Sequence, residues 1–208
     1  FSLEKEADAM IKDDSIFLFG KEMMPISEVK IVGLHNIQNI LISALIALRF
    51  GVDRKIIREV VKNFTGVEHR IEFVATVNGV PYYNDSKATN TDSVIKALEA
   101  FPSGHIVLLA GGHDKMTPLE PMMNLIREKA DMLILLGEAR ERFYQAAVTA
   151  GVENVIMADG FEAAVETAYK NARPPQVVLL SPACSSYDMF NNFEERGRYF
   201  KKLVHELE

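Results

Sequence analysis

Val80-Pro81-Tyr82-Tyr83-Asn84-Asp85-Ser86-Lys87-Ala88-Thr89-Asn90 is the stretch that best indicates how this chain folds. Its apolar-aromatic start passes into a polar loop, and a helical pattern begins near Asp92. Open α/β sheets bind ligands just beyond the carboxyl ends of their strands. Asp85, Lys87 and Thr89 place a carboxylate, an ammonium group and a hydroxyl there, so the loop is a candidate binding site.

The residues on either side of this stretch predict a hairpin followed by alternating strands and helices. Asn78-Gly79 separates two strand-like runs, 71–77 and 80–83, and Asn-Gly is the strongest short-range hairpin signal. Further strands are expected at 105–110, 132–136, 154–157 and 176–180. Helices are expected at 92–100, 119–129, 139–150, 161–171 and 189–205.

These strands are short and almost wholly apolar, as in a parallel sheet that is buried on both faces. With the intervening helices they predict an α/β fold, a doubly wound, mostly parallel, Rossmann-like sheet, over residues 68–208. Residues 1–67 predict a separate, partial segment of strands and helices. Its strands are expected at 15–19 and 29–32, and its helices at 36–50 and 54–63.

The carboxyl ends of the predicted strands collect the unusual polar residues. The loops after these strands are 84–90, 111–115, 137–140 and 181–188. Parallel strands place such loops on one edge of the sheet. Lys87 and Lys115 supply positive charge there, and Thr89, Ser185 and Ser186 supply hydroxyl groups. This combination suits a small anionic ligand.

Structural roles are the alternative explanation for several of these residues. Ser185 or Ser186 is also suited to cap the last helix. Cys184 is expected to be a packed apolar residue rather than a nucleophile, because no neighbouring base is visible in the sequence.

The same caution applies to the charged residues nearby. Asp114 and Lys115 are a candidate surface ion pair, and Glu194-Glu195-Arg196 has the pattern of a solvated helix face. Gly111-Gly112 has no third glycine at dinucleotide-binding spacing, so it predicts only a tight turn.

Composition excludes several classes of function. The 208 residues carry a formal net charge of -6 with no basic tract, which argues against nucleic acid as a partner. The single cysteine cannot form an internal disulfide and fits a reducing compartment. No Cys/His spacing suggests a metal site, and no apolar run approaches the roughly 20 residues of a membrane span. We therefore expect a cytoplasmic protein that binds small molecules, without protein ligands to a metal.

Polar residues also gather at the start of the first long helix and at the junction between the two regions. Asn36 and Asn39 lie on one side of that helix, and Asn36 is suited to cap it. His69-Arg70 lies at the junction, and the guanidinium fork of Arg70 suits a phosphate.

Four motifs, in this order, resemble those of the Mur ligase family. They are Gly33-x-His35-Asn36-x-x-Asn39, His69-Arg70-x-Glu72, Asn84-Asp85-Ser86-Lys87-Ala88-Thr89-Asn90 and Ser181-Pro182-Ala183-Cys184-Ser185-Ser186-x-Asp188-x-Phe190. The resemblance covers nearly the whole chain. The last two motifs are similar to those of the members that add D-glutamate.

The resemblance implies an ATP-dependent, amide-bond-forming ligase of peptidoglycan synthesis. In this family ATP and Mg²⁺ convert the carboxylate of UDP-N-acetylmuramoyl-L-alanine to an acyl phosphate, which the amine of D-glutamate then attacks. Residues 1–67 would be the carboxy-terminal part of a central ATP-binding domain, and residues 68–208 the amino-acid-binding domain.

The resemblance also assigns roles to single residues. The expected nucleotide-binding residues are Asn36, Asn39, Arg70, Asp85 and Lys87. Asp85 is expected at the ribose and Lys87 at the phosphates, as the candidate catalytic groups. The residues expected to hold D-glutamate are Thr89, Lys115, Ser186 and Phe193. The loop before Met116 lacks the glycine that often adjoins the family's basic residue, so its register departs from the pattern.

One motif of such ligases does not occur in the sequence. There is no Gly-x-x-x-x-Gly-Lys-[Ser/Thr] loop, and phosphoryl transfer relies on one. We therefore expect a carboxy-terminal portion of the ligase that is inactive alone and binds no cofactor tightly. A truncated surface on residues 1–67 is expected to promote self-association.

Two other interpretations stay open at this point. A folylpolyglutamate-synthase-like ligase of the same superfamily would use L-glutamate rather than D-glutamate. A non-catalytic domain that binds a small ligand would keep the polar loops without ligase chemistry.

Overall fold

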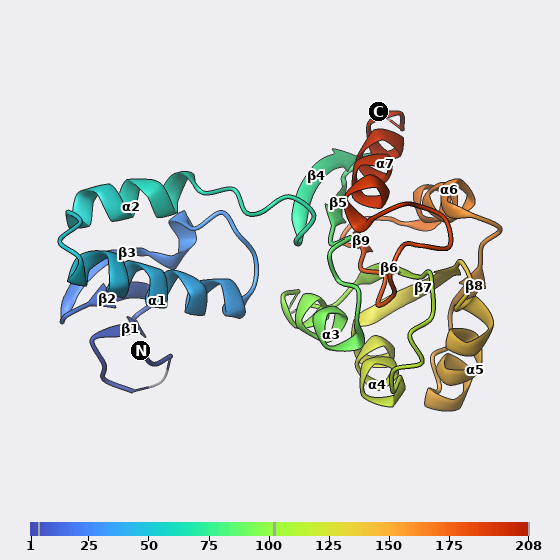
Figure 1. Ribbon diagram of the computed structural model, residues 1–208, viewed down its shortest axis with the longest axis horizontal. Helices are drawn as coiled ribbons and strands as arrows, with labels where there is room; N and C mark the ends of the chain where they lie inside the picture. The colour runs from blue at the N-terminus through green and yellow to red at the C-terminus, as the bar shows by residue number, and fades with distance from the viewer. Residues whose placement is uncertain (4, 102, 208) are drawn as a thin grey trace. The chain divides into compact units, whose positions relative to one another are not determined.

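A computed structural model describes residues 1–3, 5–101 and 103–207 of the chain. The chain divides into two units, Phe1–Gly66 and Val67–Glu208, which Figure 1 draws in blue to teal and in green to red. Each unit has its own hydrophobic core.

The first unit packs two helices against a three-stranded antiparallel sheet. The strands are β1 (Ala9–Lys12), β2 (Ser15–Leu18) and β3 (Lys21–Pro25), in the order β1-β2-β3. A short 3-10 helix, η1 (Ile26–Glu28), and the helices α1 (Leu34–Arg49) and α2 (Arg54–Asn63) follow. Ile16 from the sheet meets Leu41 and Ile57 from the two helices in the core.

Two predictions for this unit are wrong. Residues 29–32 form no strand, because Val29 and Ile31 pack against the core from a loop. Asn36 does not cap α1; Gly33 holds the cap position with a φ of 99°, and Nδ2 of Asn36 donates to the Val32 carbonyl at 2.7 Å. β1 and β3 are strands that the pattern does not predict, because charged residues interrupt their short apolar runs.

The second unit opens with the predicted hairpin. The strands β4 (Glu72–Val77) and β5 (Val80–Asn84) pair antiparallel, with Val77 opposite Val80. Asn78 and Gly79 have φ values of 50° and 80°, as a two-residue type I′ turn requires. The hairpin thus sets the direction in which β5 enters the sheet.

Strands and helices then alternate as predicted. The strands are β6 (Ile106–Gly111), β7 (Ala130–Leu136), β8 (Val155–Met157) and β9 (Val177–Leu180). The helices are α3 (Thr91–Glu99), α4 (Glu120–Lys129), α5 (Arg140–Ala150), α6 (Phe161–Asn171) and α7 (Phe193–His205).

The start of α7 differs from the prediction. The helix begins at Phe193 rather than near Met189, because the side chain of Asn192 caps it and accepts the N–H of Glu195 at 2.7 Å. Neither Ser185 nor Ser186 is the cap, so that structural explanation for the two serines is wrong.

The sheet of the second unit has the order β4-β5-β9-β6-β7-β8, and every pair except β4 and β5 is parallel. α3, α4 and α5 lie along one face, and α6 and α7 cover the other (Figure 1). The chain runs from β5 by way of β6 and β7 to β8, and α6 then returns it to β9, between β5 and β6. This reversal makes the sheet doubly wound, and ligands bind beyond the strand ends at such a switch point.

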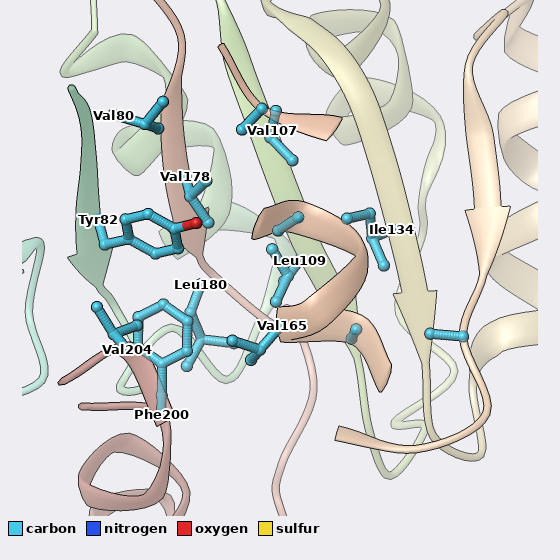
Figure 2. Packing of buried hydrophobic residues seen from close by; sticks show 14 of the residues in the cluster. Val80, Tyr82, Val107, Leu109, Ile134, Val165, Val178, Leu180, Phe200 and Val204 are labelled. Carbon is cyan, nitrogen blue, oxygen red and sulfur yellow. The ribbon is translucent and has the colours of Figure 1, made fainter. Parts of the chain in front are cut away.

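A hydrophobic cluster between the sheet and the helices α6 and α7 holds the strands in place. Tyr82 of β5 and Val178 of β9 lie opposite each other on adjacent strands. They belong to the same cluster as Val165 of α6 and Phe200 of α7 (Figure 2). Every residue of β6 is buried, as expected for a central parallel strand. This packing fixes the strand ends and therefore the loops that follow them.

Candidate functional site

Loops from distant parts of the chain meet at the carboxyl ends of the parallel strands, and we call them the rim. The rim comprises residues 84–90, 111–117, 137–140 and 181–192. The N–H of His113 donates to the Ser185 carbonyl at 3.0 Å, and that of Ala139 donates to the Gly112 carbonyl at 2.9 Å. Glycine is required at 112, where a Cβ would lie 2.6 Å from the carbonyl oxygen of Ser185.

Asp85 is a buried carboxylate at the base of the rim, with only 4% of its surface exposed. Its Oδ2 accepts from the Ser181 hydroxyl at 2.7 Å, and its Oδ1 accepts from the N–H of Ile71 at 3.2 Å. Burial raises the pKa of the Asp85 carboxyl to about 7, although both hydrogen bonds and the charge of Arg70 favour the ionised form. Asp85 therefore joins three segments and titrates near neutrality.

The segment before β4 turns sharply to reach Asp85. His69 has a φ of 66° and Ile71 a φ of 43°, which is a strained conformation for a β-branched residue. The hydrogen bond from Ile71 to Asp85 helps to hold it. The turn buries His69 and leaves Arg70 exposed.

His69 packs between the end of β5 and α7. Its Nδ1 lies 3.0 Å from Nδ2 of Asn84, which also donates to Glu72 at 3.0 Å. Burial lowers the pKa of His69, which favours the neutral imidazole, whose Nδ1 can accept a hydrogen bond. Gly197 makes room for the ring, because a Cβ there would lie 2.2 Å from Nδ1.

Arg196 of α7 is a buried cation next to the rim and is 1% exposed. Its Nε donates to the Ser86 hydroxyl at 2.9 Å, and its Nη2 donates to the carbonyls of Ser86 at 2.8 Å and Cys184 at 3.1 Å. The prediction of a solvated face at 194–196 is therefore wrong at Arg196. Burial lowers the pKa of this guanidinium to about 10, so it stays charged while it links α7 to two loops of the rim.

The exposed cations of the rim are Lys87 and Lys115. Nζ of Lys115 donates to the Thr89 carbonyl at 2.9 Å. Nζ of Lys87 lies 5.9 Å from the ring centre of Phe193, and the Phe193 carbonyl accepts from the Ser86 hydroxyl at 2.8 Å. The structure thus brings four of the predicted site residues together, on loops that follow β5 and β6 and at the start of α7.

The loop that carries Lys115 is fixed by a bidentate ion pair. Arg142 of α5 contacts Asp114 through Nε at 2.6 Å and through Nη2 at 2.7 Å. These bonds hold the pKa of Asp114 below its usual range. The predicted Asp114–Lys115 surface pair is wrong, because each residue has a different partner.

Ser186 and Cys184 lie in the loop after β9. Ser186 is 2% exposed, and its carbonyl accepts from the N–H of Phe190 at 2.8 Å. Cys184 is buried, and burial raises the pKa of its thiol to about 12. The prediction of a packed cysteine is confirmed.

The remaining predicted site residues lie elsewhere. Asn36 and Asn39 lie one turn apart on α1, half-buried and exposed respectively, and they belong to the separate first unit. Arg70 is in the second unit, near enough to Asp85 to influence its pKa.

The donor set of the rim suits an anion more than a metal ion. In the part of the chain that the structure describes, no group of three or more His, Cys, Asp or Glu could hold a metal. No described helix is long and apolar enough to cross a membrane. Exposed lysines beside serine and threonine hydroxyls favour carboxylate or phosphate groups.

Sequence patterns miss the structural roles of His69 and Arg196. The available signal is Gly197, a glycine inside an otherwise favourable helix. Glycine in a helix interior costs about 1 kcal/mol relative to alanine, so it points to a close contact.

Comparison with known proteins agrees with this fold. The family model "Mur ligase, glutamate ligase domain" matches residues 69–184. A relative from Caldicellulosiruptor bescii is 43% identical over 187 residues, which cover 90% of this chain and 41% of the relative. One from Thermoanaerobacter sp. is 43% identical over 208 residues, which cover 97% and 46%. Both are named UDP-N-acetylmuramoylalanine--D-glutamate ligase, and this chain spans less than half the length of each.

Solved structures share the fold. A UDP-N-acetylmuramate-alanine ligase from Thermotoga maritima matches with a TM-score of 0.69 and 15% identity, over 98% of this chain and 47% of that one. A folylpolyglutamate synthase from the same organism matches with a TM-score of 0.59 and 18% identity, over 85% and 44%. At these identities the likeness shows the fold alone. The family model matches more than half of the residues of this chain. The chain therefore belongs to the Mur ligase family and contains its glutamate ligase domain.

Proposed function

We propose that this chain is the carboxy-terminal part of a cytoplasmic ligase that joins D-glutamate to UDP-N-acetylmuramoyl-L-alanine in peptidoglycan synthesis. The observation that carries this proposal is the 43% identity, over nine-tenths or more of the chain, to relatives named for that reaction. In the proposed arrangement the second unit binds the amino acid, and the first unit belongs to the ATP-binding domain.

The chemistry couples ATP cleavage to amide formation. ATP with Mg²⁺ supplies the phosphoryl group that activates the substrate carboxylate as an acyl phosphate. Asn36 and Asn39 contact the nucleotide base, and the exposed Arg70 and Lys87 neutralise phosphate charge. Asp85 holds the ribose through lone pairs that remain beside its two hydrogen bonds.

The incoming D-glutamate is proposed to bind at Lys115, Thr89, Ser186 and Phe193. A dicarboxylate needs a positive charge and directional donors, which the Lys115 ammonium group and the two hydroxyls provide. The bond from Lys115 to the Thr89 carbonyl supports this grouping, because it holds the charge beside the hydroxyl-bearing residue. Correct orientation of the amine toward the acyl phosphate lowers the barrier to its attack.

The test uses the ligase expressed from its complete reading frame. Phosphate release is measured with ATP, Mg²⁺, UDP-N-acetylmuramoyl-L-alanine and either D- or L-glutamate. We expect activity with D-glutamate only. Activity with L-glutamate only would favour the folylpolyglutamate-synthase-like alternative, and no turnover with either would favour the non-catalytic one.

The assignment of Lys115 is tested in the same assay. Lys115→Gln is expected to raise KM for D-glutamate by about tenfold or more, because it removes a charged hydrogen-bond donor from a carboxylate. Lys96→Gln is the matched control, since Lys96 is an exposed lysine of α3 that pairs with Glu99. Equal KM values for the two variants would contradict the assignment.

The 208-residue chain alone is expected to be inactive and to bind nucleotide and D-glutamate weakly. Measurable ATP hydrolysis that depends on D-glutamate and on the UDP-linked substrate would overturn the first expectation. A dissociation constant in the micromolar range by calorimetry would overturn the second.

A further inference from the structure

Arg142 of α5 holds the backbone on both sides of Lys115. Its Nε and Nη2 donate to the Asp114 carboxylate at 2.6 Å and 2.7 Å. Its Nη1 and Nη2 also donate to the Thr117 carbonyl, at 3.2 Å and 3.3 Å. One guanidinium thus fastens the residue before Lys115 and the second residue after it, and a bidentate pair with a carboxylate fixes orientation as well as distance.

The turn between these two anchors depends on the same carboxylate. Met116 has a φ of 56°, a left-handed conformation that favours glycine and that other residues keep where their surroundings hold them. Its N–H donates to Oδ1 of Asp114 at 2.8 Å, the oxygen that also accepts from Nη2 of Arg142. The backbone that follows Lys115 is therefore linked to Arg142 through one carboxylate oxygen.

The pair also compensates a negative charge next to Lys115. Asp114 directly precedes Lys115, and an unpaired carboxylate there would attract the ammonium group and repel an anionic ligand. The hydrogen bonds between the two side chains lower the pKa of Asp114 and raise the pKa of Arg142, so both are charged at neutral pH. Only 12% of the Asp114 side chain and 32% of the Arg142 side chain are exposed, which limits screening by salt.

Lys115 retains hydrogen-bonding capacity for a ligand. A lysine ammonium group has three donors, and the bond to the Thr89 carbonyl at 2.9 Å uses one of them. The side chain is exposed. With Asp114 bonded to Arg142, the remaining donors are available to a carboxylate of an incoming ligand.

We propose that Arg142 is a positioning residue of the D-glutamate site, which fastens the turn that presents Lys115 and pairs with the carboxylate that would otherwise compete for it. The inference rests on the proposed function, because it needs Lys115 to hold D-glutamate. Arg142 acts through Lys115 and does not contact the amino acid, since its guanidinium is directed to Asp114 and Thr117.

The experiment measures steady-state kinetics of the ligase expressed from its complete reading frame. Arg142→Gln is expected to raise KM for D-glutamate about tenfold, the effect of weakening a hydrogen bond to a charged group, and to leave KM for ATP within about twofold. A merely structural role would reduce the amount of active enzyme, and so kcat, without raising KM for one substrate. Thermal melting checks that the variant is folded.

Two double variants test whether Arg142 acts through its neighbours. When Lys115→Gln is already present, Arg142→Gln should change KM for D-glutamate by no more than about twofold, because the group that it positions is gone. Adding Asp114→Asn to Arg142→Gln removes the uncompensated carboxylate and should lower KM for D-glutamate at least about threefold relative to Arg142→Gln alone.

Arg127→Gln is the matched control. Arg127 is an exposed arginine of α4 that donates to a backbone carbonyl, that of Ala150, at 2.9 Å. Its substitution should leave both KM values unchanged, because it lies outside the rim.

The outcomes separate this inference from the proposed function. No turnover of D-glutamate by the natural ligase would overturn the proposed function and the inference with it. Normal turnover by the natural ligase, with an unchanged KM for D-glutamate in Arg142→Gln, would overturn the inference alone. A full tenfold rise on adding Arg142→Gln to Lys115→Gln would do the same, because Arg142 would then act independently of Lys115.

Discussion

Asp85 in the rim and Arg196 in the adjoining helix α7 are buried ionisable residues, and among the described residues both form hydrogen bonds only with uncharged partners. Asp85 accepts from a hydroxyl and a backbone N–H, and Arg196 donates to a hydroxyl and two carbonyls. Burial of a charge is costly unless such bonds compensate for lost hydration. The two residues therefore make the stability of the rim sensitive to pH and to substitution.

Asp85→Asn is expected to stabilise the chain more at high pH than at low pH. Because the pKa of Asp85 is raised from 3.8 to about 7 on folding, the folded state holds the proton more tightly than the unfolded state. Ionisation then removes stability as the pH rises between those two values. An amide cannot ionise, so the stability difference should grow by up to a few kcal/mol from about pH 5 to about pH 8 in urea denaturation.

Asp159→Asn is the control for this experiment. Asp159 is exposed and pairs with Arg140 at the surface, so its substitution should give a much smaller pH-dependent difference. A difference between the Asp85 variant and the natural chain that does not change with pH would contradict the raised pKa.

Arg196→Lys is expected to destabilise the chain by about 2–4 kcal/mol, because lysine cannot serve the three acceptors of the guanidinium and leaves buried oxygens unpaired. Urea denaturation measures the loss. Arg198→Lys, two residues further along α7 and exposed, should change stability by no more than about 0.5 kcal/mol. Similar losses for both variants would show that the buried network matters little.

At the scale of single elements, α7 organises the rim. Its first residue, Phe193, accepts from the Ser86 hydroxyl, Arg196 joins two loops, and Gly197 accommodates His69. The helix also packs on β4 and β5 through residues such as Phe200. A change in its register would therefore move the loops after β5 and β9 together.

Gly197→Ala is expected to destabilise the chain although alanine favours helices by about 1 kcal/mol. The new Cβ would lie 2.2 Å from Nδ1 of His69, and such overpacking costs roughly 1–3 kcal/mol. His69→Ala should relieve the contact, so the double variant should be more stable than the sum of single losses predicts. Additive losses in denaturation, or a gain from Gly197→Ala, would contradict the contact.

Elements of the second unit were the most predictable from sequence. β6 and β7 are nearly continuous apolar runs, and buried parallel strands require such runs whatever their neighbours. The errors occur where tertiary packing overrides the local pattern. The apolar residues at 29–32 pack from a loop, and the segment between Met189 and Asn192 precedes α7 instead of joining it.

At the scale of the whole molecule, the first unit exposes apolar side chains on both of its α-helices. Ile46 on α1 is 52% exposed, and Phe50, directly after α1, is 86% exposed. On α2, Ile56 is 57% exposed and Val60 is 62% exposed. Exposed apolar residues that gather on one element mark interaction surfaces or promote association. We therefore propose that the isolated chain self-associates through this unit.

The prediction is tested by light scattering during size-exclusion chromatography. The natural chain should be dimeric or larger at high concentration, and the double variant Ile56→Lys, Val60→Lys should be monomeric because charged residues are costly to bury in an apolar contact. Residues 67–208 expressed alone are the matched control and should also be monomeric. A monodisperse monomer for the natural chain would refute the proposal.

The sequence by itself determined the order of strands and helices in the second unit, the hairpin at Asn78-Gly79 and the polar loops at the strand ends. These features follow from local hydrophobic periodicity and turn chemistry, which a single sequence displays. Only the tertiary structure decided that β9 lies between β5 and β6, that Arg196 is buried and that Asp85 titrates near neutrality. Strand order, burial and pKa depend on contacts between residues far apart in the chain, such as Asp85 with Ser181, and local patterns carry no record of those contacts.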